Sequence, residues 1–108
     1  MVKRKIDTEI IKIVESFTEE VKKYYKVDFV ILFGSFAKGN QHEDSDIDVA
    51  VVTKDIQNTF DDSVKMSRMT WDIDLRIEPH AIRTEDYENN ATALINEIIT
   101  TGVQIFAA

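Results

Sequence analysis

The sequence contains no cysteine, and this absence removes several kinds of chemistry. A disulfide framework, a thiolate metal site and a cysteine nucleophile are all excluded, and a reducing cytoplasm is the simplest setting for the chain. Long apolar runs are also missing. No stretch approaches the roughly 20 apolar residues that span a bilayer, and polar residues interrupt the first twelve residues where a signal peptide would carry its apolar core. We therefore expect a cytoplasmic protein with no membrane partner.

Basic residues are scarce relative to acidic ones. Thirteen Lys and Arg stand against twenty Asp and Glu, which gives a net charge of −7. This is the wrong sign for a surface that grips nucleic acid through many phosphates, so we expect no strong direct nucleic-acid binding. Thirteen of the acidic residues lie between positions 43 and 88. A metal site would explain this concentration, and an ordinary solvated acidic face would explain it equally.

The length and apolar content predict one domain that covers residues 1–108. A chain of 108 residues with 44% hydrophobic composition can bury a substantial core, and two independent domains would be unusually small. Helical spacing of apolar residues occurs in the segments 6–24, 56–69 and 91–98. Strand patterns occur at 28–33, 46–52, 71–78 and, for a short last strand, 103–106.

These elements predict an α/β (α+β) fold, with a small mixed β-sheet of three to four strands and flanking helices. In this prediction Pro79 closes the third strand, and residues 80–83 form a loop. Thr84 caps a short turn, and Gly102 ends the final helix. One helical turn is expected between residues 35 and 42.

The first candidate site residues follow the strand at 28–33. Gly34 lets the backbone turn sharply and approach a ligand closely, because it has no Cβ. Ser35 offers a hydroxyl at the start of the expected helical turn, where backbone N–H groups favour an anion. Taken alone, this pair would more often be an ordinary strand-to-helix turn with a serine cap.

Asp46 and Asp48 are two residues apart in an expected strand, so both side chains leave the same face. Two carboxylates beside a phosphate-binding turn suit Mg²⁺, which is commonly held by one or two carboxylates together with substrate phosphates. A third carboxylate from a neighbouring strand could hold a second Mg²⁺. Asp72 and Asp74 are the candidates, and Asp74 is preferred because Ile73 and Leu75 centre it in the expected strand. The alternative is that Asp46 and Asp48 simply lie on the solvated face of a strand.

The set of Gly34-Ser35, Gly39 and Ser45-Asp46-Ile47-Asp48 resembles the signature of the DNA polymerase β-like nucleotidyltransferase superfamily. The short length, Ala37-Lys38-Gly39 and the later Asp74 are similar to its minimal nucleotidyltransferases, the MNT domains. The resemblance covers about residues 29–78. It implies the nucleotidyltransferase fold, a triphosphate near Gly34 and Ser35, and divalent metal at Asp46 and Asp48. Asp74 would be the third acid, which in that family helps to activate the incoming hydroxyl.

The resemblance also implies an enzyme that transfers AMP from ATP to an acceptor hydroxyl. Lys38 is expected to bind a phosphate together with Gly34 and Ser35. Relatives often carry Arg at this position, and Lys keeps the charge but lacks the bidentate fork. MNT domains are often paired with a helical HEPN protein, so the implied acceptor is a hydroxyl on a HEPN-type partner, in a toxin–antitoxin pair. The alternative is a non-catalytic antitoxin that neutralises a helical partner by forming a complex. A homo-oligomer is left open.

Two further polar residues are weighed for roles in the site. His80 could be a catalytic base or a ligand, although a histidine after a strand is more often a packing or surface residue. Arg76 could hold a phosphate or pair with a carboxylate, and the ion pair is at least as well supported.

Overall fold

The computed structural model describes residues 6–108. Residues 1–5 lie outside the described part. They belong to the twelve-residue segment that was expected to lack a signal-peptide core. The elements in chain order are α1 (Thr8–Val21), β1 (Val27–Phe33), α2 (Ser35–Lys38), β2 (Ile47–Thr53), α3 (Thr59–Arg68), β3 (Ile77–Arg83), α4 (Thr84–Glu88), α5 (Ala93–Thr101) and β4 (Val103–Ala107). No helix among residues 6–108 is long and apolar enough to cross a membrane.

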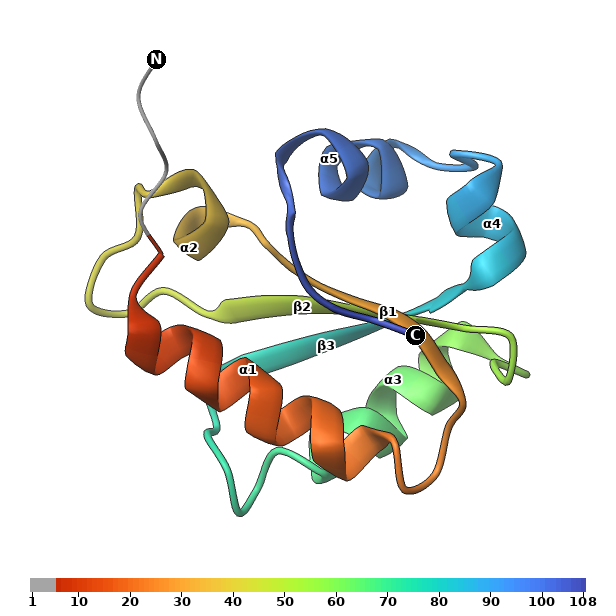
Figure 1. The fold of residues 1–108 in the computed structure, drawn as a ribbon, viewed down its shortest axis with the longest axis horizontal. Helices are drawn as coiled ribbons and strands as arrows, with labels where there is room; N and C mark the ends of the chain where they lie inside the picture. The colour runs from red at the N-terminus through yellow and green to blue at the C-terminus, as the bar shows by residue number, and fades with distance from the viewer. Residues whose placement is uncertain (1–5) are drawn as a thin grey trace.

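The strands form one mixed sheet in the order β3-β2-β1-β4. β1 is antiparallel to both β2 and β4, whereas β2 and β3 are parallel and are joined by a crossover through α3. Figure 1 shows this sheet with helices on both sides. The predicted α/β fold with a small mixed sheet and flanking helices is confirmed, and the sheet has four strands.

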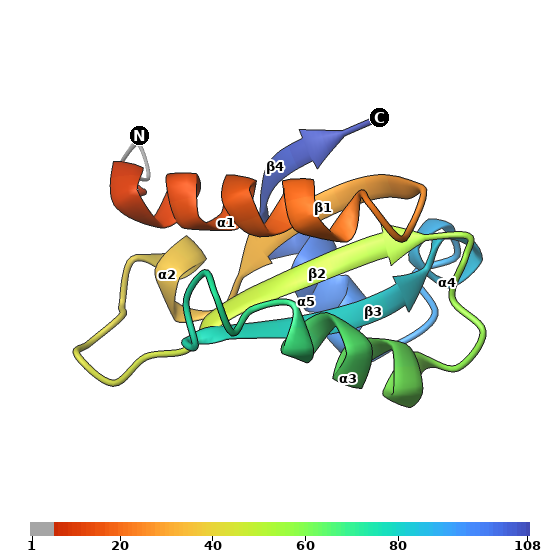
Figure 2. The same cartoon turned by 90° about the horizontal axis from the view of Figure 1, so that it is seen from below.

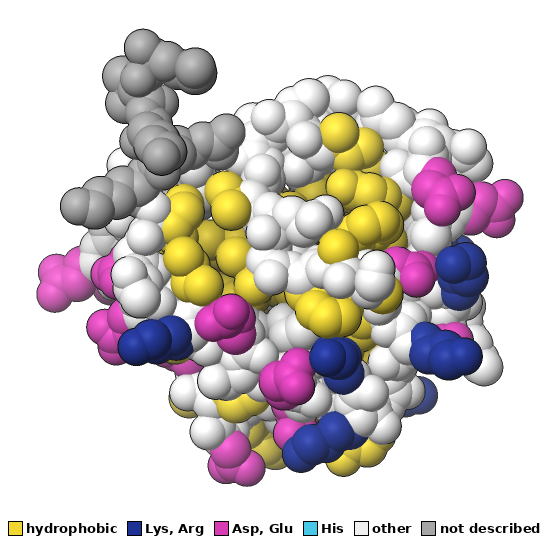
Figure 3. Space-filling model, viewed as in Figure 1, with side chains coloured by type: hydrophobic (Ala, Val, Ile, Leu, Met, Phe, Trp, Pro, Cys, Tyr) yellow, Lys and Arg dark blue, Asp and Glu magenta, His cyan; other side chains and the backbone are white. Residues whose placement is uncertain are grey.

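Two apolar layers bury the two faces of the sheet. α1 and α3 pack on one face, where a large cluster includes Phe17, Leu32 and Met66. α4 and α5 cover part of the other face, where Ile95 and Ile98 meet the side chains of β1 and β2. Figure 2 shows α1 and α3 along the sheet. In Figure 3 hydrophobic side chains reach the surface around the edge strand β4, because β4 is only partly covered.

The first helix illustrates how local sequence sets the ends of an element. Asp7 caps α1 by accepting a hydrogen bond from the Glu9 N–H at 2.9 Å, which satisfies a donor that a helix start leaves open. The buried residues of α1 recur every three or four positions and include Ile10, Val14 and Phe17. The expected helix over 6–24 is therefore confirmed with shorter ends.

The prediction of a third strand at 71–78 was wrong. Most of that segment forms turns, and the strand runs from Ile77 to Arg83. The polar–apolar alternation fits a strand, but Trp71 is 68% exposed and Leu75 is 75% exposed, so the alternation buries neither side chain. By contrast, Ile77, Ala81 and Ile82 are buried against the helices. The residues with a place in the core form the strand.

Pro79 was expected to end the strand, yet it lies in the middle of β3. Successive residues of a parallel strand direct their N–H groups to opposite sides, so residues two apart direct them to the same side. The Ala81 N–H donates to the Ser63 Oγ of α3 at 2.9 Å rather than to β2, so the proline nitrogen two residues earlier also faces away from β2. β3 is an edge strand, and no ladder hydrogen bond is lost there.

A buried carboxylate anchors the start of α3. Asp62 is 5% exposed and accepts hydrogen bonds from the Tyr25 hydroxyl at 2.7 Å and from the N–H groups of Gln57 and Asn58 at 3.0 and 3.1 Å. Burial acts to raise the pKa of Asp62, but these hydrogen bonds outweigh it and hold the pKa below its ordinary value. The carboxylate therefore stabilises the fold above its unfolded-state pKa, and this stability is lost as pH falls through the folded-state pKa.

We expect Asp62→Asn to lower the free energy of unfolding by about 1–3 kcal/mol at neutral pH, because an amide cannot accept from all three donors. The loss should begin to shrink as the pH falls below about 4, where the carboxyl of the unfolded chain becomes protonated, and should disappear below the lower pKa of the folded state. Urea unfolding at several pH values measures both effects. The exposed neighbour in Asp61→Asn is the control, and equal losses in the two variants would contradict the assignment.

Candidate active site

A glycine turn brings the end of β1 against the start of β2. Gly34 has φ 75° and ψ −151°, a conformation that is essentially restricted to glycine. A Cβ at this position would collide with the Asp48 carboxylate. Gly34 therefore permits both the turn and the close approach of the two strands. The role predicted for Gly34 in the backbone turn is confirmed, whereas its contact with a phosphate stays a prediction.

The next residues form the expected single helical turn. Ser35 is half-buried and begins α2, and Gly39 ends that helix in the left-handed conformation. Lys38 lies at the end of α2, where its Nζ pairs with Glu97 Oε1 of α5 at 3.2 Å. Both side chains are well exposed, so this ion pair contributes little to stability. Ser35 and Lys38 as phosphate ligands remain predictions.

The two strand carboxylates stand at the start of β2. Asp46 is exposed and directly precedes the strand, and Asp48 is half-buried within it. The loop before them is fixed by Ser45, whose Oγ accepts a hydrogen bond from the His42 N–H at 2.9 Å. Asp48 alternates with Val49 and shares its sheet face with Ala50, which packs towards α5. The aspartates are thus held by a strand start and an ordered turn.

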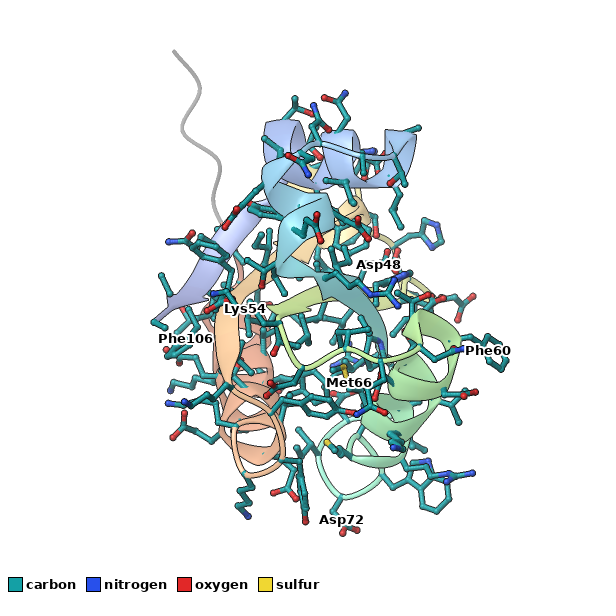
Figure 4. The ribbon with its side chains drawn as sticks, turned by 90° about the vertical axis from the view of Figure 1, so that its right-hand side faces the viewer. Asp48, Lys54, Phe60, Met66, Asp72 and Phe106 are labelled. Atoms are coloured by element: carbon teal, nitrogen blue, oxygen red, sulfur yellow. The ribbon has the colours of Figure 1, made fainter. Side chains whose placement is uncertain are left out.

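The register of β2 and β3 brings further polar residues to this face. Asp48 is paired with Glu78, and Ala50 with His80. The ligand atoms of Asp48, Glu78 and His80 all lie within 4.8 Å of one another, and His80 Nε2 is 3.3 Å from Asp48 Oδ1. Figure 4 shows Asp48 on this face, with the strands of the sheet beneath it. Two carboxylates and an imidazole therefore converge on one point.

Electrostatic repulsion marks the same cluster. The pKa of the Glu78 carboxyl is raised, first by partial desolvation against the sheet, and then by the negative charges of Asp48 and Asp46, while His80 opposes the shift. The side chain of Glu78 nevertheless keeps substantial exposure to solvent. Asp46 hence interacts with Glu78, and four polar residues belong to one site.

The structure does not bring Asp74 into this cluster. Asp74 lies in the turn before β3, and both of its oxygens are engaged by Arg76, at 3.1 Å to Nε and 2.8 Å to Nη2. The hydrogen bond from Arg76 lowers the pKa of Asp74. The alternative, Asp72, is exposed, and Figure 4 shows it at the lower end of the molecule, well below Asp48, which lies near the middle. The strand that was expected to present these acids starts three residues after Asp74.

The donor set fits a divalent cation. Ligands of a six-coordinate ion are about 3 Å apart when adjacent and about 4 Å apart when opposite. The 3.3 Å between His80 and Asp48 and the 4.8 Å limit for the group are close to those values. The pKa of Glu78 is raised first by desolvation and then by the charges of Asp48 and Asp46, and a cation would offset those charges. Asp46, Asp48 and Glu78 could hold it through oxygen, and His80 through nitrogen.

The sequence alone did not identify Glu78 as a site residue. It offered His80 as a possible ligand but did not place it next to Asp48. Glu78 was visible on the polar side of the expected third strand, but Asp74 was closer to its centre. The usable signal was the core-forming set Ile77, Ala81 and Ile82, which moves the strand towards the C-terminus and makes Glu78 and His80 neighbours on one face.

Comparison with known proteins identifies relatives across nearly the whole chain. Residues 15–108 match the family described as polymerase beta, nucleotidyltransferase. A protein of Methanocaldococcus jannaschii that is assigned by name as a protein adenylyltransferase is 32% identical over 103 residues, which are 90% of this chain and 99% of that protein. Other curated relatives are matched over about half of their own length, for example 55% and 51%.

Solved structures share the fold. A Sulfolobus solfataricus protein assigned as a nucleotidyltransferase superposes with a TM-score of 0.69 at 24% identity, over 92% of this chain and 81% of that one. A structure described as a toxin–antitoxin with AMP-PNP gives a TM-score of 0.60 at 22% identity, over 91% and 73% of the two chains. At such identities these likenesses establish the architecture alone.

Proposed function

The chain belongs to the polymerase beta nucleotidyltransferase family, and we propose that it transfers AMP from ATP to a hydroxyl group on a partner protein. One observation carries the proposal. Asp48 and Glu78 meet beside the Gly34 turn, and the carboxylate of Asp46 acts on Glu78, so cation ligands adjoin a place where a phosphate can approach the backbone. The name of the Methanocaldococcus relative, protein adenylyltransferase, supports AMP as the group and a protein as the acceptor.

Separate residues of the chain position the triphosphate and bind the cation that neutralises its charge. Gly34 allows the triphosphate to approach the main chain, and the Ser35 hydroxyl donates a hydrogen bond to a phosphate oxygen. Asp46, Asp48 and Glu78 supply oxygen ligands for Mg²⁺, and a two-ion site fits three carboxylates. When bound, Mg²⁺ polarises the α-phosphate and offsets negative charge on the departing pyrophosphate.

Glu78 takes the place in this proposal that was first given to Asp74. The acceptor oxygen forms a bond to the α-phosphorus as the bond to the bridging oxygen of pyrophosphate breaks, and the proton of the acceptor hydroxyl passes to the Glu78 carboxylate. Asp74 is occupied by Arg76 and steadies the turn before β3.

The partner is proposed to be a HEPN-type protein in a toxin–antitoxin pair. The architecture is shared with a structure described as a toxin–antitoxin with AMP-PNP, and this supports both the pairing and ATP as the substrate. The acceptor is then a tyrosine or a similar hydroxyl on the partner.

Transfer can be followed with α-labelled ATP, Mg²⁺ and the co-expressed partner. We expect label on the partner with the wild-type chain and almost none with Asp46→Asn/Asp48→Asn, because the substitution removes two cation ligands and leaves the strand intact. The same assay with the other three nucleotides reports base preference. Equal labelling by the wild type and the double variant would contradict the proposal. An inactive complex whose partner carries no label would instead favour neutralisation by occlusion.

A further inference from the structure

We propose that His80 supplies a nitrogen ligand to the cation at Asp48 and Glu78, so that this site prefers a first-row transition ion such as Mn²⁺ over Mg²⁺. The inference rests on the metal site of the proposed function and goes further by assigning a ligand and a metal preference. It starts from the strand register, which places Glu78 and His80 on the same face of β3, opposite Asp48 and Ala50 of β2.

The orientation of the imidazole is set by packing. His80 lies with its ring centroid 5.0 Å from that of Phe33 at an interplanar angle of 62°, an edge-to-face arrangement that holds aromatic rings in place. Its side chain is only 26% exposed. The ring edge that carries Nε2 faces the Asp48 carboxylate at 3.3 Å. The nitrogen is thus aimed at the point where the carboxylates converge.

The chemistry of the three donors separates metals. Mg²⁺ binds oxygen ligands, keeps several water molecules and gains little from imidazole. Imidazole nitrogen suits first-row transition ions, whereas carboxylate oxygens suit both groups. A site of two carboxylates and one histidine within 4.8 Å therefore discriminates through His80. Mn²⁺ accepts oxygen and nitrogen together, and it retains the octahedral coordination that a nucleotide site needs.

The competing reading is that His80 only packs on Phe33 and donates a hydrogen bond to Asp48. Both readings place the ring in the same position without metal, and they differ once a metal binds. A packing residue leaves the inner coordination sphere made of oxygen. A ligand puts nitrogen next to the metal, which pulsed electron paramagnetic resonance detects as coupling between the Mn²⁺ electrons and the nitrogen nucleus.

The test uses the full chain with Mn²⁺ alone, without nucleotide. The sequence has two histidines, so His42→Asn is a matched control for His80→Asn. We expect nitrogen coupling in the wild type and in His42→Asn, and its loss in His80→Asn. Titration should show that His80→Asn weakens Mn²⁺ binding by about 10-fold or more, on the scale of disturbing a metal–histidine contact, with a clearly smaller change for Mg²⁺. Circular dichroism checks that each variant is folded.

Three results would overturn the inference: Mn²⁺ bound without nitrogen coupling, coupling that survives in His80→Asn, or no Mn²⁺ binding at millimolar concentration. The outcome is separable from that of the proposed function. If AMP is transferred but Mn²⁺ shows no nitrogen coupling, His80 is not a metal ligand and the proposed AMP transfer still stands. If nitrogen coupling is seen but no AMP is transferred, the metal site with His80 is supported and the proposed AMP transfer is contradicted.

Discussion

Glu78→Gln is expected to lower the rate of AMP transfer by about 10²- to 10³-fold, the scale on which removal of one preorganised charge-stabilising group acts. The substitution keeps the size and shape of the side chain. It removes a negatively charged ligand of the cation and the base that receives the acceptor proton. Glu78 pairs with Asp48 across β2 and β3, so no other carboxylate from β3 can take its position. Single-turnover transfer with saturating ATP measures the effect on the chemical step.

Asp74→Asn is the matched control for that prediction. It should retain nearly the wild-type rate, because Asp74 is engaged by Arg76 outside the cluster. The loss of this partly exposed ion pair should lower the free energy of unfolding by at most about 1 kcal/mol. If Asp74→Asn abolished transfer and Glu78→Gln preserved it, Asp74 would be the third acid and the assignment of Glu78 would be wrong.

Gly34→Ala is expected to reduce transfer by about 100-fold, the size of effect that a displacement of about 1 Å produces in a reacting site. The added Cβ would collide with the Asp48 carboxylate, so either Asp48 rotates away or the turn moves. The backbone conformation at φ 75° and ψ −151° also disfavours alanine by about 1–3 kcal/mol. Transfer rate and urea unfolding should both be measured, since the two effects have different causes.

Gly39→Ala separates these two causes. Gly39 also has a positive φ, 78°, but a Cβ there meets nothing within 4 Å. The left-handed conformation disfavours alanine by about 1 kcal/mol, so this variant should lose stability and keep its transfer activity. A Gly34→Ala variant that behaves like Gly39→Ala would show that the approach to Asp48 is unimportant for the reaction.

The sequence predicted the part of the site that depends on local pattern. The apolar run that stops at Gly34 gave β1 and its turn, and the alternation around Ile47 gave β2 with Asp46 and Asp48 at its start. In both segments the apolar residues that form the pattern are also the residues that pack in the core. Local pattern and tertiary packing agree there, so the prediction of the fold class was confirmed.

The third strand could not be located in the same way, because its register depends on pairing with β2. Two overlapping segments alternate, and only packing against α3 and α5 selects the one that starts at Ile77. The proline at position 79 argued against that choice, and an edge position with Ser63 receiving the Ala81 N–H removes the objection. The shift moves the third acid from Asp74 to Glu78.

The most direct test of the account is the intact mass of the partner after co-expression with this chain. The account predicts that the partner gains one or more AMP-sized increments with the wild type and none with Asp48→Asn, while Asp74→Asn still supports the modification. A partner of unchanged mass in a stable complex with the wild-type chain, or equal modification with Asp48→Asn, would contradict AMP transfer by the cluster of Asp46, Asp48 and Glu78.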